Sequence, residues 1–399
     1  MIGGIVGSYA DVNIGDHELW SWKNYYDKWY FTKQDRVREV SNDESSDFIG
    51  YKIDAKSLIR RLQLAGYDLN SARYDFEEVR ASWISDMEES LGDYHQEDSD
   101  LVHEITANLK VVEANNFDNW LKALPRALEL SQNRFKAGNF ESKVQIEGEP
   151  LLSFMLSDFY GVFEDNQGFV GAMFPCNRVE TYALILLEIL PDDVVCTLDI
   201  TDLVSGGWVD DFDDIAQVQV GETHFFELLT TSLDELHTLN STSENHVLQR
   251  MLFASVITTM EAYLSDTMKR HVLNRDAIKR RFVESHASFS KKMNKSEVFS
   301  FLDSLDKTLN EEIDRISFHN IDIVKDLYKR VLLCEFPEDH LSKLRPLIYM
   351  RHDIVHRNGK KSDGNIVKVS QQDVVELIEL VTYVAQAIDL QIIDGMLID

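Results

Sequence analysis

The sequence predicts an α+β protein, in which a mixed α/β region (residues 1–217) is followed by an all-α helical bundle (residues 218–399). Two observations lead to this prediction. Before about residue 220, short β-type runs alternate with helical stretches, and glycines cluster there. Beyond that point the helical segments are long and contain only two prolines. With 399 residues, 44% of them hydrophobic, the chain can fill the cores of two ordinary domains.

In the first region, three β-type runs predict strands, at 4–14, 143–148 and 194–201. Helices are expected over residues 69–91 and over 96–137, the latter as an insertion between the strand-rich parts. The run DDFDDI at 210–215 is interpreted as a solvated acidic linker.

Two aspartates, Asp199 and Asp202, stand at the end of the strand run predicted at 194–201 and directly after it. Such carboxylates superficially resemble an acidic metal site, but no partner glutamate motif accompanies them. They are interpreted as turn and strand-end residues.

In the second region a helix is predicted over residues 245–271, with apolar side chains at helical spacing and Ser243 available as its cap. Near the end, Ser370 and Asp373 form a capping-box signature that opens another helix. One stripe of that helix is apolar and comprises Val374, Ile378, Val381, Ala385, Ile388 and Ile392.

Further helices are expected over residues 319–333 and 338–356. The second of these should stop at Asn358 and Gly359, because these residue types tolerate the left-handed backbone that ends helices.

Charge is distributed unevenly. Residues 221–399 contain 22 Lys and Arg against 28 Asp and Glu, a net −6, so that −23 of the chain's −29 falls on residues 1–220. A field of that sign repels polyanions and argues against general nucleic-acid binding by the first region. Within the second region, residues 268–281 carry six Lys or Arg, which are interpreted as solvated helix faces or as a local RNA contact.

Several classes of protein are disfavoured. The start of the chain lacks a secretory signal pattern, and the longest apolar run, 183–190, is interrupted by Glu188 and too short to cross a bilayer. Three separated cysteines indicate neither a disulfide framework nor a zinc site, so a cytoplasmic location is expected. No Walker A loop, dinucleotide fingerprint or Ser/His/Asp arrangement is present.

The stretch RHDIVHRNGKK, at 351–361, gathers charge at the end of a predicted helix. Arg351 and His356 form an R-x4-H pair, but a chain of this composition contains about 0.6 such pairs by chance. Arg281 and His286 have the same spacing, and are set aside because nothing around them indicates a capped helix end.

The context of the first pair, LRPLIYMRHDIVHRNGKKSDGN after the helical MEAYLSD, resembles the HEPN superfamily, in particular RiboL-PSP-associated HEPN proteins. The family motif is R-x4-6-H with a polar residue after the arginine, here His352. The stretches GSYADVNIGDHELWSWKN, GYDLNSARYDFEE and LDITDLVSGGW resemble the N-terminal HEPN/Toprim-associated domain, over about residues 1–215. That acidic domain is assigned a sensing or regulatory role.

This resemblance implies a metal-independent endoribonuclease that needs no cofactor, with toxin-like or antiviral roles. RNA supplies its own 2′-hydroxyl nucleophile, so cleavage requires proton transfer and positive charge on the phosphorane. His356 and Arg351 have the right chemistry, since histidine titrates near neutrality and arginine matches phosphate oxygens. The expected products are a 2′,3′-cyclic phosphate and a 5′-hydroxyl.

The spacing of Arg351 and His356 also bears on whether the protein forms a dimer. On an ideal helix five residues turn through 500°, so Arg351 and His356 point about 140° apart. Either the helix ends irregularly at HRNG, or a second copy supplies part of the site. The resemblance implies the second arrangement, a homodimer through the C-terminal helical domain.

Supporting residues are assigned in the same way. Glu261 pairs with Arg351 or lies on a solvated edge, and Asp353 orients an arginine or histidine or forms a surface salt bridge. RNA phosphates are expected to bind the basic residues and the amide beyond the helix, which are Arg357, Asn358, Lys360 and Lys361.

Three alternatives stay open. His352 and His356 share a helix face at a metal-compatible spacing, but no third ligand is evident, so no metal is expected. A non-catalytic HEPN scaffold that binds RNA or protein remains the rival function. A regulatory or antitoxin partner is compatible with the acidic first region.

Overall fold

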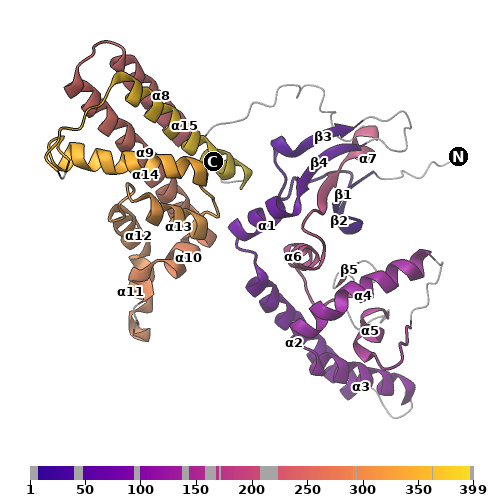
Figure 1. Ribbon diagram of the computed structural model, residues 1–399. Coiled ribbons are helices and arrows are strands. Elements are labelled where there is room, and N and C mark those ends of the chain that lie inside the picture. The colour runs from indigo at the N-terminus through magenta and orange to yellow at the C-terminus, as the bar shows by residue number, and fades with distance from the viewer. Residues whose placement is uncertain are drawn as a thin grey trace. The chain divides into compact units, whose positions relative to one another are not determined.

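The computed structural model describes residues 8–39, 48–93, 99–136, 143–157, 168–169, 172–206, 223–290, 292, 294–361 and 363–395. The chain forms two compact units, Met1–Val218 and Gln219–Asp399. The first contains an antiparallel five-stranded sheet with helices, and the second is all helical where it is described, which gives the α+β class predicted above (Figure 1). The predicted acidic linker at 210–215 lies outside the described residues.

The sheet of the first unit has the order β2-β1-β7-β4-β3. Side chains alternate along β1, where Ala10, Val12 and Ile14 are buried, as expected for a strand with one covered face. The strands are β1 (Tyr9–Ile14), β2 (His17–Lys23), β3 (Arg36–Glu39), β4 (Phe48–Asp54) and β7 (Val195–Asp199), and a separate short pair is formed by β5 (Gly168–Phe169) and β6 (Ala172–Met173).

Seven helices are described in this unit, and α1 and α6 contact both the sheet and each other. The remaining long helices enclose an aromatic core in which Trp83 and Trp120 are fully buried, 6.1 Å apart between ring centroids. The helices are α1 (Ala55–Leu64), α2 (Leu69–Asp93), α3 (Ser99–Ala114), α4 (Phe117–Lys136), α5 (Pro150–Met155), α6 (Val179–Ile189) and α7 (Thr201–Ser205).

The strand predicted at 143–148 is wrong, because the described backbone there forms no sheet ladder. The Val144 and Ile146 amides donate instead to the hydroxyls of Ser157 and Ser153. The strand-end interpretation is confirmed for Asp199, the last residue of β7, whose side chain accepts from the Thr201 amide. It is wrong for Asp202, which lies in the first turn of α7 and accepts from the Tyr9 amide.

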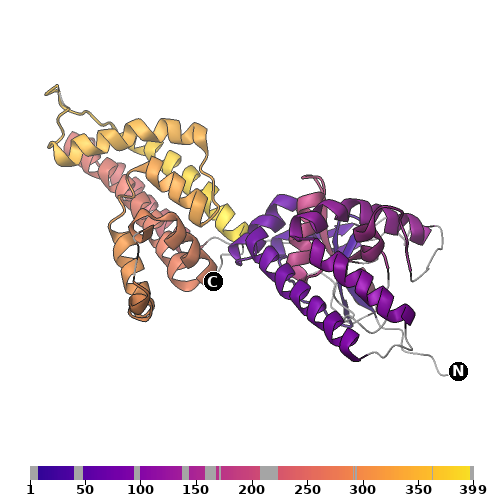
Figure 2. The same ribbon diagram turned by 90° about the horizontal axis from the view of Figure 1, so that it is seen from below.

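In the second unit α9 is the central helix and packs against α8, α10, α12, α14 and α15 (Figures 1 and 2). The unit comprises α8 (His224–Asn240), α9 (His246–Asn274), α10 (Asp276–Ser285), α11 (Val298–Asp303), α12 (Leu305–Asp314), α13 (Ile321–Val331), α14 (Glu338–His356) and α15 (Gln371–Asp394). The predicted apolar stripe of α15 is buried throughout, and its Ser370/Asp373 capping box is present.

Two details of α9 and α10 correct the prediction. Asn245, and not Ser243, caps α9, because its side chain accepts from the Val247 and Leu248 amides. His286 does follow a helix end, since α10 stops at Ser285, and its ring stacks on Phe282.

Candidate functional site

The C-terminal half of α14 carries the R-x4-H pair. Two acidic residues in the first turn, Glu338 and Asp339, suit the positive end of the helix dipole, and Leu341, Leu344 and Ile348 anchor the inner face. Pro346 lies inside the helix, which continues without interruption from there to His356.

The end of α14 is set by two residues with positive φ, Asn358 at 52° and Gly359 at 75°. The Gly359 amide donates to the carbonyls of Asp353 and Ile354, which satisfies the last turn of the helix. Gly359 is buried, and a Cβ at this position would lie 2.6 Å from Arg250 Nη1. Glycine is therefore favoured by the backbone conformation, and a side chain at this position would also require the end of the Arg250 side chain to move.

Arg351 points toward α9, with 13% of its side chain exposed. Its Nη2 lies 3.5 Å from Oε1 of Glu261, whose side chain is 18% exposed, so the alternative in which Glu261 pairs with Arg351 is the one observed. Among the described side chains, however, neither Glu261 Oε1 nor Arg351 Nε has a hydrogen-bond partner. The two charges are close, but their hydrogen bonding is incomplete.

Burial raises the pKa of the Glu261 carboxyl, while the charges of Arg351 and His319 act in the opposite direction. His319 precedes α13, and its Nδ1 lies 3.7 Å from the same Oε1 of Glu261. Sequence reasoning did not single out His319. It lies 58 positions from Glu261 in a loop with no local motif, and only the packing of α9 against neighbouring helices brings the two together.

His352 and His356 are both exposed on the outer face of α14, with ring centroids 4.7 Å apart and planes tilted by 40°. The structure thus brings these two histidines together but leaves His356 on a different side of the helix from the inward-pointing Arg351. No group of three or more potential metal ligands is found among the described residues.

Asp353 forms a salt bridge on the helix surface, and its partner is an arginine. Its Oδ1 accepts from Arg357 Nη1 at 3.0 Å, one turn along the helix, and it has no recorded contact with Arg351. Arg357 is thereby held beside the histidine face.

Beyond the helix, residues 357–369 fold back on themselves. Lys360 and Ile366 form an isolated antiparallel β-bridge. The Lys361 amide donates to the Asn365 carbonyl, and the Val367 amide donates to the Gly359 carbonyl. Asn358, Lys360 and Lys361 are exposed. A basic loop therefore lies next to His356.

The other basic cluster, 268–281, is largely engaged within the protein. Lys269 pairs with Asp314, Lys279 pairs with Asp306 at 2.8 Å, and Arg281 donates to the Arg330 carbonyl. The interpretation as a helix face fits these contacts better than a phosphate-binding patch.

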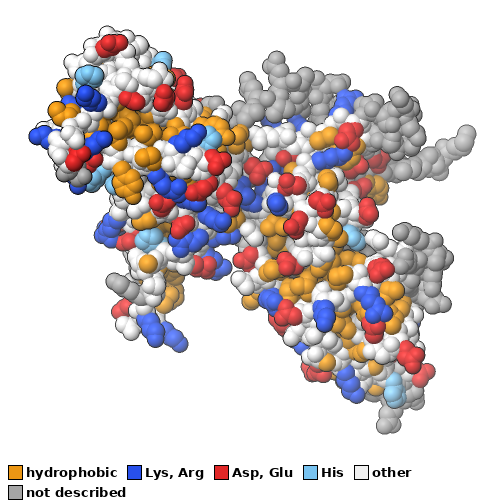
Figure 3. All heavy atoms as spheres, viewed as in Figure 1, with side chains coloured by type: hydrophobic (Ala, Val, Ile, Leu, Met, Phe, Trp, Pro, Cys, Tyr) orange, Lys and Arg blue, Asp and Glu red, His pale blue; other side chains and the backbone are white. Residues whose placement is uncertain are grey.

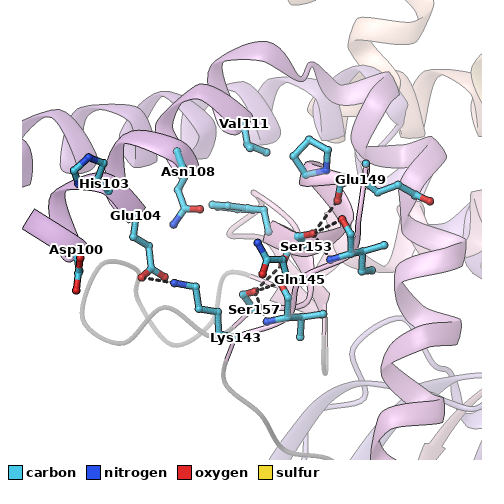
Figure 4. A pocket seen from close by; sticks show the side chains of 16 residues that line it. Asp100, His103, Glu104, Asn108, Val111, Lys143, Gln145, Glu149, Ser153 and Ser157 are labelled. Atoms are coloured by element: carbon cyan, nitrogen blue, oxygen red, sulfur yellow. Dashed lines mark hydrogen bonds and ion pairs between the residues drawn. The ribbon is translucent and has the colours of Figure 1, made fainter.

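The first unit contains a cavity of about 680 Å³ between α3, the segment 143–150 and α5 (Figure 4). Lys143 crosses it to Glu104 at 2.8 Å, and the hydroxyls of Ser153 and Ser157 on its floor bond the neighbouring backbone. These side chains therefore have structural roles.

No helix in the described part of the chain combines the length and apolar composition needed to cross a membrane.

Two family models match the chain. Residues 6–223 match the HEPN/Toprim N-terminal domain 1, and residues 226–394 match RiboL-PSP-HEPN. Comparison with curated proteins found no match, and comparison with solved structures found none either. The site on α14 lies within the second match. The chain therefore belongs to the HEPN superfamily, with a HEPN/Toprim N-terminal domain followed by a RiboL-PSP-HEPN domain.

Proposed function

We propose that this protein is a metal-independent endoribonuclease whose site is built on the last turns of α14. The observation that carries the proposal is the division of α14 into two faces. Arg351 is held inward by Glu261 at 3.5 Å, while His352 and His356 are exposed beside a basic loop. A permanent cation, titratable imidazoles and phosphate-binding side chains are what RNA cleavage without a metal requires.

In the proposed reaction the 2′-hydroxyl of the RNA attacks the adjacent phosphorus, and the bond from phosphorus to the 5′-oxygen breaks. One proton leaves the 2′-oxygen and one is delivered to the departing 5′-oxygen, so that a 2′,3′-cyclic phosphate and a 5′-hydroxyl form. His356 takes part in this proton transfer, and Arg351 stabilises the charge that develops on the phosphorane.

The proposed assembly is a homodimer through the C-terminal unit. Because α14 remains helical from Arg351 to His356, an irregular helix end does not bring these two residues to one phosphate. A second copy related by a two-fold axis can supply the missing partner to each site.

Exposed apolar side chains support this assembly. They include Tyr349 and Val355 on α14 and Met251 on α9, which are 74%, 49% and 64% exposed. In the space-filling view hydrophobic side chains form a band across the α14 side of this unit, with Lys and Arg side chains at its edges (Figure 3). Burying such a band against a second copy is favourable.

RNA is proposed to enter along the basic loop, where Lys360 and Lys361 contact phosphates and Arg357 is held in place by Asp353. The acidic N-terminal unit is proposed to sense a trigger or restrain the nuclease, by itself or with a regulatory or antitoxin partner. A toxin-like or antiviral role in the cytoplasm is proposed as well, and only membership of the HEPN superfamily supports it.

The test is cleavage of total RNA and tRNA in EDTA by the wild type and by the Arg351→Ala and His356→Ala variants, with analysis of the fragment ends. Cyclic-phosphate ends, lost in both variants, are expected. The chain offers a matched control: Arg281→Ala and His286→Ala alter the other R-x4-H pair and should leave cleavage intact.

One observation also fits the rival function, a non-catalytic scaffold. The Arg351–Glu261 pair links α14 to α9 and can serve only to fix the position of α14 on α9, as it would in a non-catalytic scaffold. A wild type that binds RNA without cutting it under any of these conditions would establish the scaffold and overturn the nuclease.

A further inference from the structure

The site contains one titratable cation that the R-x4-H motif does not include. His319 approaches Glu261 from the loop between α12 and α13, which is anchored by the buried Phe318 next to it. Its Nδ1 and Arg351 Nη2 lie 3.7 and 3.5 Å from the same atom, Glu261 Oε1. One carboxylate is thus shared by two cations from two different elements.

Because Arg351 and His319 share Glu261, the net charge of the site depends on the protonation of His319. An ionised Glu261 neutralises a single positive charge, so the three groups together carry +1 when His319 is protonated and zero when it is neutral. Arg351 and His319 are the charged groups that act on Glu261 within the described chain. The hydroxyl of Ser317 is another polar neighbour of the imidazole, 2.8 Å from His319 Nε2 and 3.1 Å from its Nδ1.

The contacts of Glu261 with Arg351 and His319 are also weak enough for another group to replace one of the partners. Glu261 Oε1 and Arg351 Nε lack hydrogen-bond partners among the described residues, and His319 keeps 43% of its side chain exposed. An RNA phosphate that binds Arg351 must compete with Glu261 for the guanidinium. A protonated His319 offers Glu261 a second partner and lowers the cost of that competition.

We propose that His319 is a positioning residue of the RNA site, which retains Glu261 while Arg351 engages a phosphate and thereby makes RNA affinity depend on pH. This inference rests on the proposed function. It adds a residue outside the R-x4-H motif and a direction: affinity is higher when His319 is protonated. Because the His319–Glu261 pair is partly exposed, its effect is modest, roughly two- to fivefold in RNA affinity.

The experiment measures binding with an RNA that cannot be cut. Fluorescence anisotropy of a labelled single-stranded 2′-O-methyl RNA is recorded with the full-length protein at about pH 6 and about pH 8, a range that spans imidazole titration. His352 and His356 also carry imidazoles, so each variant is compared with the wild type at each pH. The variants are His319→Gln and His319→Lys, and the control is His340→Gln, since His340 stacks on Tyr383.

The Gln variant should match the wild type at the higher pH and bind roughly two- to fivefold more weakly at the lower one. The Lys variant should keep the tighter binding at both, and the control should behave as the wild type. Equal weakening of the Gln variant at both pH values would indicate a structural role and overturn the proposal, as would an unchanged pH dependence. A wild type that neither binds this RNA nor cuts natural RNA defeats the proposed function, and this inference with it.

Discussion

Glu261 Oε1 lies 3.5 Å from Arg351 Nη2, which joins the centre of α9 to the last turns of α14 through an ion pair that is mostly shielded from solvent. Burial raises the pKa of this carboxyl even though two cations oppose the shift. For an acid whose pKa is higher in the folded state, the folded protein binds the proton more tightly than the unfolded chain does. The ionised carboxylate therefore lowers stability near neutrality, and this penalty disappears as the pH falls through the folded pKa.

Glu261→Gln should consequently raise the free energy of unfolding at about pH 7, with a difference from the wild type that shrinks toward about pH 4. RNA cleavage should fall in the same variant, because Arg351 loses the charge that positions it. Urea unfolding at the two pH values and a cleavage assay at the higher one test both statements. A variant less stable than the wild type near neutrality would mean that the attraction to Arg351 outweighs the cost of burial.

The proposed composite site predicts complementation between inactive variants. If Arg351 comes from one copy and His356 from the other, a mixed dimer of Arg351→Ala and His356→Ala contains one intact site and one doubly defective site. Random mixing at equal amounts makes half of the dimers mixed, so roughly one quarter of wild-type activity should return.

Unfolding and refolding the two variants together, followed by the RNA cleavage assay, measures this recovery. Each variant refolded alone is the control. Absence of recovery, in dimers shown by mass to be mixed, would contradict a site divided between copies in this way.

The turn after α14 offers a test of local strain. Gly359→Ala places a side chain at φ 75° and within 2.6 Å of Arg250 Nη1, whereas Gly364→Ala has a similar φ of 85° but open space around its Cβ. The backbone cost is about 1–2 kcal/mol at each position. Gly359→Ala should lose more stability than Gly364→Ala, because Arg250 must also move. Urea unfolding of both variants measures the difference, and equal losses would show that Arg250 adapts freely.

Helix α15 could be predicted in detail, since a capping box and a regular apolar stripe are local signals that the tertiary fold also uses. The stop of α14 was predictable for the same reason: Asn358 and Gly359 accept positive φ at low cost. The false strand at 143–148 shows the limit of such patterns. Val144 and Ile146 alternate as in a strand, but serine hydroxyls take their amides, and periodicity cannot distinguish that partner from a neighbouring strand.

The site was only partly accessible from sequence. Family resemblance marked Arg351 and Glu261, and their contact is present. Asp353 had two equally reasonable roles, and its pairing with Arg357 depends on side-chain direction on the helix surface. His319 had no signal at all, because a contact between residues 261 and 319 arises from tertiary packing alone.

The basic loop makes a prediction about salt. Lys360 and Lys361 are exposed next to the proposed site, and the loop backbone is fixed by bonds from Lys361 to Asn365 and from Val367 to Gly359. Each lysine that neutralises a phosphate releases counterions, so single-stranded RNA binding loses about 0.7 in the slope of log affinity against log salt per contact. The Lys360→Ala/Lys361→Ala double variant should therefore bind RNA more weakly, with a slope shallower by about 1.4.

The matched control for the loop variant is Lys292→Ala/Lys295→Ala, which removes two exposed lysines remote in sequence from α14. Anisotropy with 2′-O-methyl RNA over a salt series measures both slopes. If the control changes the slope as much as the loop variant does, the binding follows net charge, and the assignment of RNA contacts to this loop fails.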